Sequence, residues 1–132
     1  MRFQSQRIGA RAEYRQQESQ RVNDSASLLD KFPLLKFLTV DVSYHDSEGV
    51  TTGTQVKYRL NLDKAKSVLR FDCLNNECIR GDFDLSEELA KAVAGRWTTA
   101  SGEKCCQGWR DKTTINTMHC HNILRYKLSL GY

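Results

Sequence analysis

The sequence has 132 residues, of which 39% are hydrophobic and 27% charged, and its formal net charge is +4. This size and composition are typical of one globular domain, and no stretch approaches the roughly 18 apolar residues of a membrane-spanning helix. The N-terminal stretch MRFQSQRIGARAEYRQQ has no apolar run typical of a secretory signal, so we expect a cytoplasmic protein whose thiols stay reduced.

The first segment, residues 1–33, is rich in arginine and glutamine and has few large apolar side chains. Arg7, Arg11 and Arg15 recur every fourth residue, which places them on one face of any helix that forms. Isolated helices with so little apolar surface are marginal. We therefore predict a basic N-terminal arm, flexible or helical, with a short helix before Pro33, preceding a domain over residues 34–132.

Alternation of apolar and polar residues then predicts strands. Residues 38–44 and 56–62 alternate on either side of a turn at 45–49, so they should form an antiparallel hairpin. A third strand is expected over residues 69–73. The last strand is expected over residues 124–130.

One amphipathic helix is predicted between the third and last strands. Residues 84–87 match a capping box with Asp84 in the cap position. Leu85, Leu89 and Val93 follow at helical spacing, and the helix should end near Gly95.

Residues 98–117 are rich in threonine, serine, glycine and charge, and we expect a loop there. Together these elements predict an α+β domain: a small antiparallel sheet of about four strands with one packed helix, preceded by the arm. We expect the domain to be zinc-stabilised, because a core of this size gains much from a structural metal.

The five cysteines predict how that stabilisation works. An odd number does not suit a disulfide framework, whereas clustered reduced thiols suit zinc. Cys73 and Cys120 share strand parity with apolar residues, so both should face the core. Cys78 lies in a short loop after Cys73, and Cys106 is followed by a Gln-Gly turn. We predict Cys73, Cys78, Cys106 and Cys120 as the four ligands of a structural zinc ion.

Three further residues are alternative metal ligands. Cys105 could replace its neighbour Cys106, and His119 or His121 could replace a thiol if the last strand is bulged. The parity of that strand points both histidines away from Cys120, which favours the four-cysteine set.

Adjacent Cys105 and Cys106 also allow a redox hypothesis. A vicinal disulfide is strained and therefore labile, and Lys104 is a cationic neighbour that could lower a thiol pKa. The sequence shows no phosphate-binding loop, HExxH motif or nucleophile elbow, so an enzyme is the minority interpretation.

The remaining function classes are binding functions. We expect a protein partner first, with residues 1–33 ordered on it, and a homodimer through open sheet edges is an alternative. A nucleic-acid or ribonucleoprotein partner is the other alternative, because arginine suits bidentate phosphate contact. The candidate phosphate-binding residues are Arg2, Arg7, Arg11, Arg15, Arg110 and Lys112.

Overall fold

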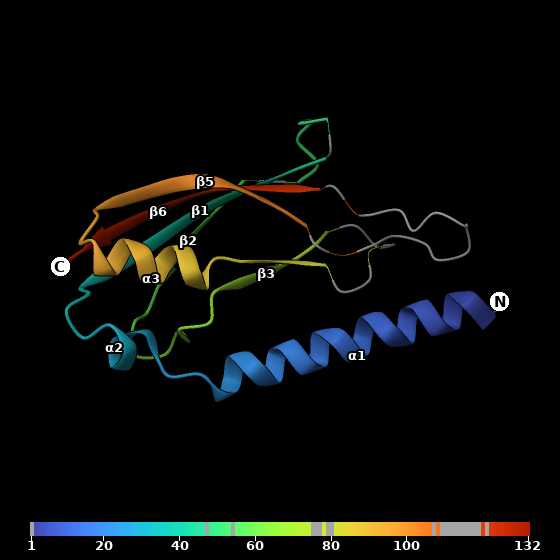
Figure 1. Cartoon of the computed structure of the whole chain (residues 1–132), viewed down its shortest axis with the longest axis horizontal. Helices are drawn as coiled ribbons and strands as arrows, with labels where there is room; N and C mark the ends of the chain where they lie inside the picture. The colour runs from blue at the N-terminus through green and yellow to red at the C-terminus, as the bar shows by residue number, and fades with distance from the viewer. Residues whose placement is uncertain are drawn as a thin grey trace.

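The computed structural model describes residues 2–46, 48–53, 55–74, 78, 81–106, 108, 120 and 122–132, with side chains from residue 12 onward. The described helices are α1 (Arg2–Asp24), α2 (Leu28–Lys31) and α3 (Ser86–Ala94). The described strands are β1 (Phe37–His45), β2 (Val56–Leu60), β3 (Arg70–Asp72), β4 (Asp82–Asp84), β5 (Thr99–Cys105) and β6 (Ile123–Gly131). Figure 1 shows the main sheet and α3 at one end of the molecule and the C-terminal part of α1 beside β3.

The main sheet is antiparallel, with four strands in the order β2-β1-β6-β5. Val40 stands opposite Tyr58 on β2 and Leu128 on β6, so the alternating apolar residues of three strands share one face. This confirms the α+β class, the hairpin of residues 38–44 and 56–62, and the last strand.

The membership of the sheet differs from the prediction at two places. Residues 99–105, expected as loop, form β5, which pairs along its full length with β6. Its sequence, Thr-Ala-Ser-Gly-Glu-Lys-Cys, has almost no apolar side chain, so the backbone ladder rather than apolar patterning places it in the sheet.

The expected third strand is present as β3 but does not join the main sheet. β3 pairs with β4 in a separate two-stranded sheet, with Phe71 opposite Phe83. A strand of three residues has too little alternation to show its partner in the sequence, and β4 is equally short.

The core lies between one face of the main sheet and α3. Leu38, Val40, Leu124 and Leu128 from the sheet are almost fully buried, as is Leu89 on α3. The apolar stripe predicted for the helix therefore faces the sheet (Figure 1).

The cap of α3 lies one residue later than predicted. Leu85 is the N-cap residue, and the Asp84 carboxylate accepts hydrogen bonds from the Ser86 backbone N–H at 2.9 Å and from its hydroxyl at 2.5 Å. Asp84 thus still satisfies a helix-terminal N–H, and the helix ends before Gly95 as expected.

The N-terminal segment, predicted to be flexible or helical, is a helix, and this helix contacts the domain. Tyr14 on α1 donates a hydrogen bond to the Asp82 carboxylate at 3.0 Å. Arg21 pairs with Asp84 at 2.9 Å, and Arg15 pairs more loosely with Asp72 at 3.9 Å. All three contacts reach the β3–β4 sheet, so the second half of α1 packs on that sheet. The domain boundary near residue 33 stays a prediction.

Candidate metal centre

Four cysteine side chains meet where the two sheets adjoin. Cys73 follows β3, Cys106 follows β5, Cys120 lies three residues before β6, and Cys78 comes from the connection between β3 and β4. All four are buried, and their sulfur atoms lie within 4.8 Å of one another. The cluster therefore connects the two-stranded sheet to two strands of the main sheet.

The spacing of the sulfurs suits a tetrahedral metal site. Zinc–sulfur bonds of about 2.3 Å place tetrahedral thiolates roughly 3.8 Å apart. The Sγ atoms of Cys73 and Cys120 are 3.7 Å apart, and those of Cys78 and Cys106 are 3.5 Å apart. Such an arrangement is typical of structural metal sites and leaves no coordination position for a substrate.

The local backbone brings the thiols together through interlocking hydrogen bonds. Cys106 N–H donates to the Asn122 carbonyl and Cys120 N–H to the Gly108 carbonyl, both at 2.9 Å. These bonds hold the end of β5 against the start of β6. Cys73 N–H donates to the Gly81 carbonyl at 3.3 Å, which closes the loop that carries Cys78.

Gly81 is required by the closeness of the cluster. A Cβ atom at this position would collide with Sγ of Cys78 and would lie 2.7 Å from Sγ of Cys106. Both contacts are far inside van der Waals distance, so any side chain would displace two of the four sulfurs.

Two outer groups direct hydrogen-bond donors at the sulfurs. The Gly108 N–H lies 3.4 Å from Sγ of Cys106, and the Asn122 side-chain amide lies 3.8 Å from Sγ of Cys73. Donors of this kind stabilise negative charge on thiolates and orient metal ligands. Neither residue was predicted as part of the site, although each lies two residues from a cysteine.

The charge state of the cluster explains why a cation would suit it. Hydrogen bonds from Cys106, Cys73 and Cys78 lower the pKa of the Cys120 thiol. The pKa of Cys78 is raised, chiefly through its hydrogen bond with Cys106, and the pKa of Cys106 is raised, chiefly through its hydrogen bond with Cys120. Alone, the cluster therefore favours a thiolate at Cys120 and protonated thiols at Cys78 and Cys106. A divalent cation would offset the repulsion and favour deprotonation of all four.

Of the three alternative metal ligands, the structure describes only Cys105. Cys105 is exposed and lies outside the cluster, because its side chain alternates to the opposite face of β5 from Cys106. His119 and His121 lie outside the described residues. Lys104, the expected activator of a redox pair, instead pairs with Glu88 at 2.6 Å.

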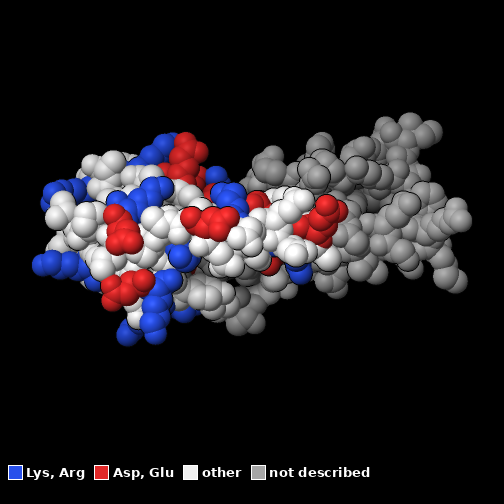
Figure 2. Space-filling view, turned by 90° about the horizontal axis from the view of Figure 1, so that it is seen from below, with Lys and Arg blue, Asp and Glu red and all other residues white. Residues whose placement is uncertain are grey.

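Of the six predicted phosphate-binding residues, only Arg15 has a side chain that the structure describes. Arg15 pairs with Asp72 and donates to the Cys73 carbonyl at 3.5 Å. The side chains of Arg2, Arg7 and Arg11, and the whole of Arg110 and Lys112, lie outside what the structure describes. On the side where α1 lies, Figure 2 shows basic and acidic side chains interspersed over the coloured surface.

The chain matches no protein-family model, no curated protein and no solved structure. Among the described residues, none of the helices combines the length and apolar character needed to cross a membrane. Any function assigned to the chain therefore has to rest on the chemistry of its own residues, and above all on the four-thiol cluster.

Proposed function

We propose that this chain is a non-catalytic binding module whose fold is stabilised by one zinc ion. The observation that carries the proposal is the cluster of four buried thiols, whose sulfurs lie within 4.8 Å of one another. A four-thiolate site is coordinatively complete, so the metal would serve the fold and leave function to the molecular surface.

Zinc suits these ligands better than other common metals. Thiolates are soft donors, and a tetrahedral four-sulfur set favours zinc or iron over magnesium, calcium or copper(II). Zinc has no redox chemistry and accepts the geometry that the protein imposes, which fits a site with a purely structural role.

Exposed apolar side chains support contact with a protein partner. Leu34, Val50, Leu74 and Trp97 are each at least half exposed, and all four lie in connections between elements. β2 and β5 are the edges of the main sheet, so pairing of edge strands would produce the predicted homodimer.

Nucleic-acid binding is the second candidate, and it rests on a different observation. The outer face of the main sheet carries Lys57 and Arg59 beside the exposed ring of Phe37. The redox hypothesis is weaker, because Cys106 lies inside the cluster while Cys105 faces the opposite side of its strand.

The test is metal analysis of protein purified without added metal, combined with thermal melting before and after chelation. We expect about one zinc per chain and a large loss of stability on chelation. Cys120→Ser should abolish stoichiometric zinc, whereas the matched control Cys105→Ser should keep it.

Stoichiometric iron would retain the metal centre but replace zinc as its occupant. A protein that binds no metal and melts identically with and without chelator would contradict the proposal. The same conclusion would follow if Cys105→Ser lost zinc as completely as Cys120→Ser.

A further inference from the structure

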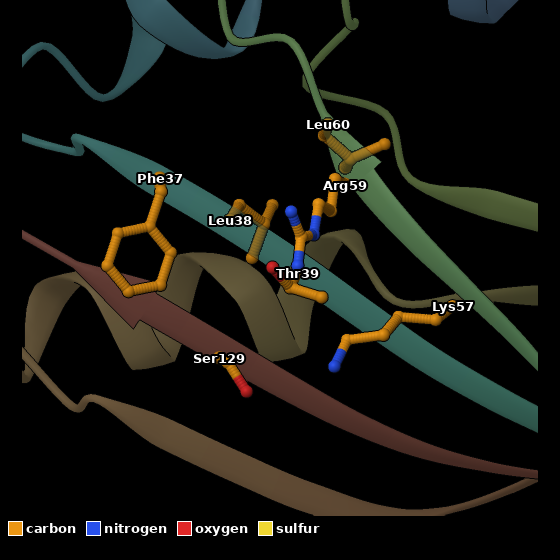
Figure 3. A pocket seen from close by; sticks show the side chains of 7 residues that line it. All are labelled: Phe37, Leu38, Thr39, Lys57, Arg59, Leu60 and Ser129. Atoms are coloured by element: carbon orange, nitrogen blue, oxygen red, sulfur yellow. The ribbon is translucent and has the colours of Figure 1, made fainter.

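The outer face of the main sheet, opposite the core, contains a groove with a volume of about 360 Å³. Figure 3 shows the side chains that line it on neighbouring strands, with Phe37 near one end, Lys57 near the other and Ser129 between them. The groove draws on β1, β2 and β6, the three strands whose core-facing residues are mainly apolar.

Strand parity directs these residues outward. Along β1, Phe37, Thr39 and Asp41 alternate with core residues Leu38 and Val40. Cross-strand pairing places Arg59 and Ser129 on either side of Thr39.

Phe37 supplies an exposed aromatic platform in a fixed position. Its ring lies over Gly131, where a Cβ atom would collide with the ring carbon Cε1. The glycine thus lets the ring rest on the sheet backbone, while 53% of the residue remains exposed to solvent. An aromatic side chain held against a sheet in this way is suited to stacking on a base.

The cations that line the groove form no ion pair within the part of the chain that the structure describes. No ion pair among the described residues involves Lys57, Arg59 or Lys127, and no acidic residue lines the groove. The nearest acid on this face is Asp41, which stands between Lys57 and Lys127 in the sheet register.

The rest of this face does not cancel that positive charge. Arg125 is paired with Glu103 at 2.7 Å, so that pair contributes no net charge. Lys57, Arg59 and Lys127 against Asp41 leave an excess of positive charge on this face of the sheet.

We propose that this groove binds single-stranded nucleic acid. One base stacks on Phe37, and the phosphates next along the strand contact Lys57 and Arg59. The hydroxyls of Thr39 and Ser129, in the same cross-strand row as Arg59, hydrogen-bond to sugar or phosphate oxygens. This inference rests on the proposed binding function and names its partner class.

The combination of ring and cations favours this partner over an acidic peptide. A run of carboxylates would satisfy Lys57 and Arg59 but would leave Phe37 without a stacking partner. A duplex hides the faces of its bases, so it cannot use the ring either. Phe37 lies four residues along β1 from the row of Lys57, about 13 Å at strand spacing, which leaves room for more than one nucleotide.

The experiment measures binding of a fluorescently labelled single-stranded oligonucleotide of mixed sequence to the metal-loaded full chain, by anisotropy at several salt concentrations. Phe37→Ala should weaken binding at least five-fold through lost stacking, while Phe37→Trp should retain it. The double variant K57A/R59A should weaken binding and reduce the slope of log K against log salt by about 1.4, the value for two phosphate contacts on a single strand.

The matched control is K64A/K91A, which removes the same charge at two exposed positions away from the groove. It should change affinity much less than K57A/R59A. Thermal melting of each variant verifies that Phe37→Ala and the double variants remain folded.

Three outcomes would overturn the inference. The first is no binding by chain that carries its metal and melts normally; this result would leave the proposed metal-stabilised fold intact. The second is binding that Phe37→Ala does not change, which would mean a surface that attracts any polyanion. The third is equal competition by polyglutamate or by duplex. Failure of the proposed function would instead appear as absent metal, whatever the oligonucleotide result.

Discussion

The two sheets of this molecule are stabilised in different ways. The main sheet has four strands and buries leucine and valine side chains against α3. The β3–β4 sheet has two strands of three residues each. A two-stranded sheet is at best marginally stable by itself, so the smaller one must be held by something other than its own ladder.

Cysteines and charged side chains supply what the small sheet lacks. Cys73 ends β3 inside the four-thiol cluster. Arg70 on β3 is almost buried and pairs with Asp72 at 2.8 Å and with Asp82 on β4 at 3.1 Å. Phe83 on β4 is buried in the same core as the leucines, so apolar burial reaches both sheets, whereas the candidate metal and these ion pairs act on the smaller one.

The position of α1 depends on the smaller of the two sheets. Its described contacts with the domain fall on Asp72, Asp82, Asp84 and the Cys73 carbonyl, all on or beside β3 and β4. The helix therefore depends on the sheet that the cysteines hold. Loss of metal should release α1 even where the main sheet survives.

The largest expected effect comes from removing the proposed zinc ion. Structural zinc contributes about 10–16 kcal/mol of apparent binding free energy in small zinc domains. Hydrogen exchange should show loss of protection in β3, β4 and α1 on chelation, with β1 and β6 losing less. The matched variants Cys78→Ser and Cys105→Ser should differ, because only Cys78 lies in the cluster.

Uniform loss of protection throughout the chain would show that the two ends unfold as one unit. Unchanged protection in β3 and β4 would show that the ion pairs alone hold the small sheet. Either result would break the distinction between the two sheets.

Leu128→Ala tests the contribution of leucine burial in the main sheet. Leu128 is fully buried on β6 and stands opposite Val40. Truncation of a buried leucine costs about 2–5 kcal/mol. Denaturant unfolding should show this loss with metal bound, whereas the control Leu34→Ala, at an exposed position, should show less than about 0.5 kcal/mol.

Leu128→Ala should leave stoichiometric zinc binding intact, because it removes none of the four sulfur atoms, although leucines and cysteines belong to one buried core. A variant that lost its metal together with its stability would show that the leucine core and the cluster depend on each other.

The same contrast explains what the sequence could predict. Strands β1, β2 and β6 alternate apolar and polar residues over five to nine positions, so their pairing with a buried face was predictable. Cys73 directly follows β3 and Cys120 precedes β6, and the alternation of each strand, extended to these positions, likewise predicted that the two thiols face the core. The choice of Cys106 over Cys105 followed from the turn after it.

The sequence did not predict the features that depend on contacts with distant residues of the chain rather than on the local alternation of apolar and polar residues. β5 has polar residues throughout and joins the sheet because β6 offers a free edge. The contacts of α1 join Tyr14 to Asp82 and Arg21 to Asp84, separations of more than 60 residues that no local periodicity encodes. The close approach of Gly81 to two sulfurs, which excludes any side chain there, likewise appears only in three dimensions.

The smallest expected effect comes from Tyr14→Phe. Tyr14 donates its hydroxyl hydrogen to Asp82 at 3.0 Å, with Glu18 at 3.1 Å as a second acceptor. Removing the hydroxyl should cost about 1 kcal/mol and should lower hydrogen-exchange protection in α1 more than in β6. The control Glu13→Gln changes an exposed residue on the same helix and should have no such effect.

The pH dependence sharpens this last test. Burial, followed by the charge of Asp82, raises the pKa of Tyr14 above its ordinary value of about 10. The folded state therefore retains the phenol proton that the unfolded chain loses first, so the stabilising contribution is complete below pH 10 and declines above it. The stability difference between wild type and Tyr14→Phe should shrink as the pH rises past 10. A difference that stayed constant would mean that the hydroxyl contributes through packing alone, and that α1 is held by Arg21 and Asp84 rather than by the Tyr14–Asp82 hydrogen bond.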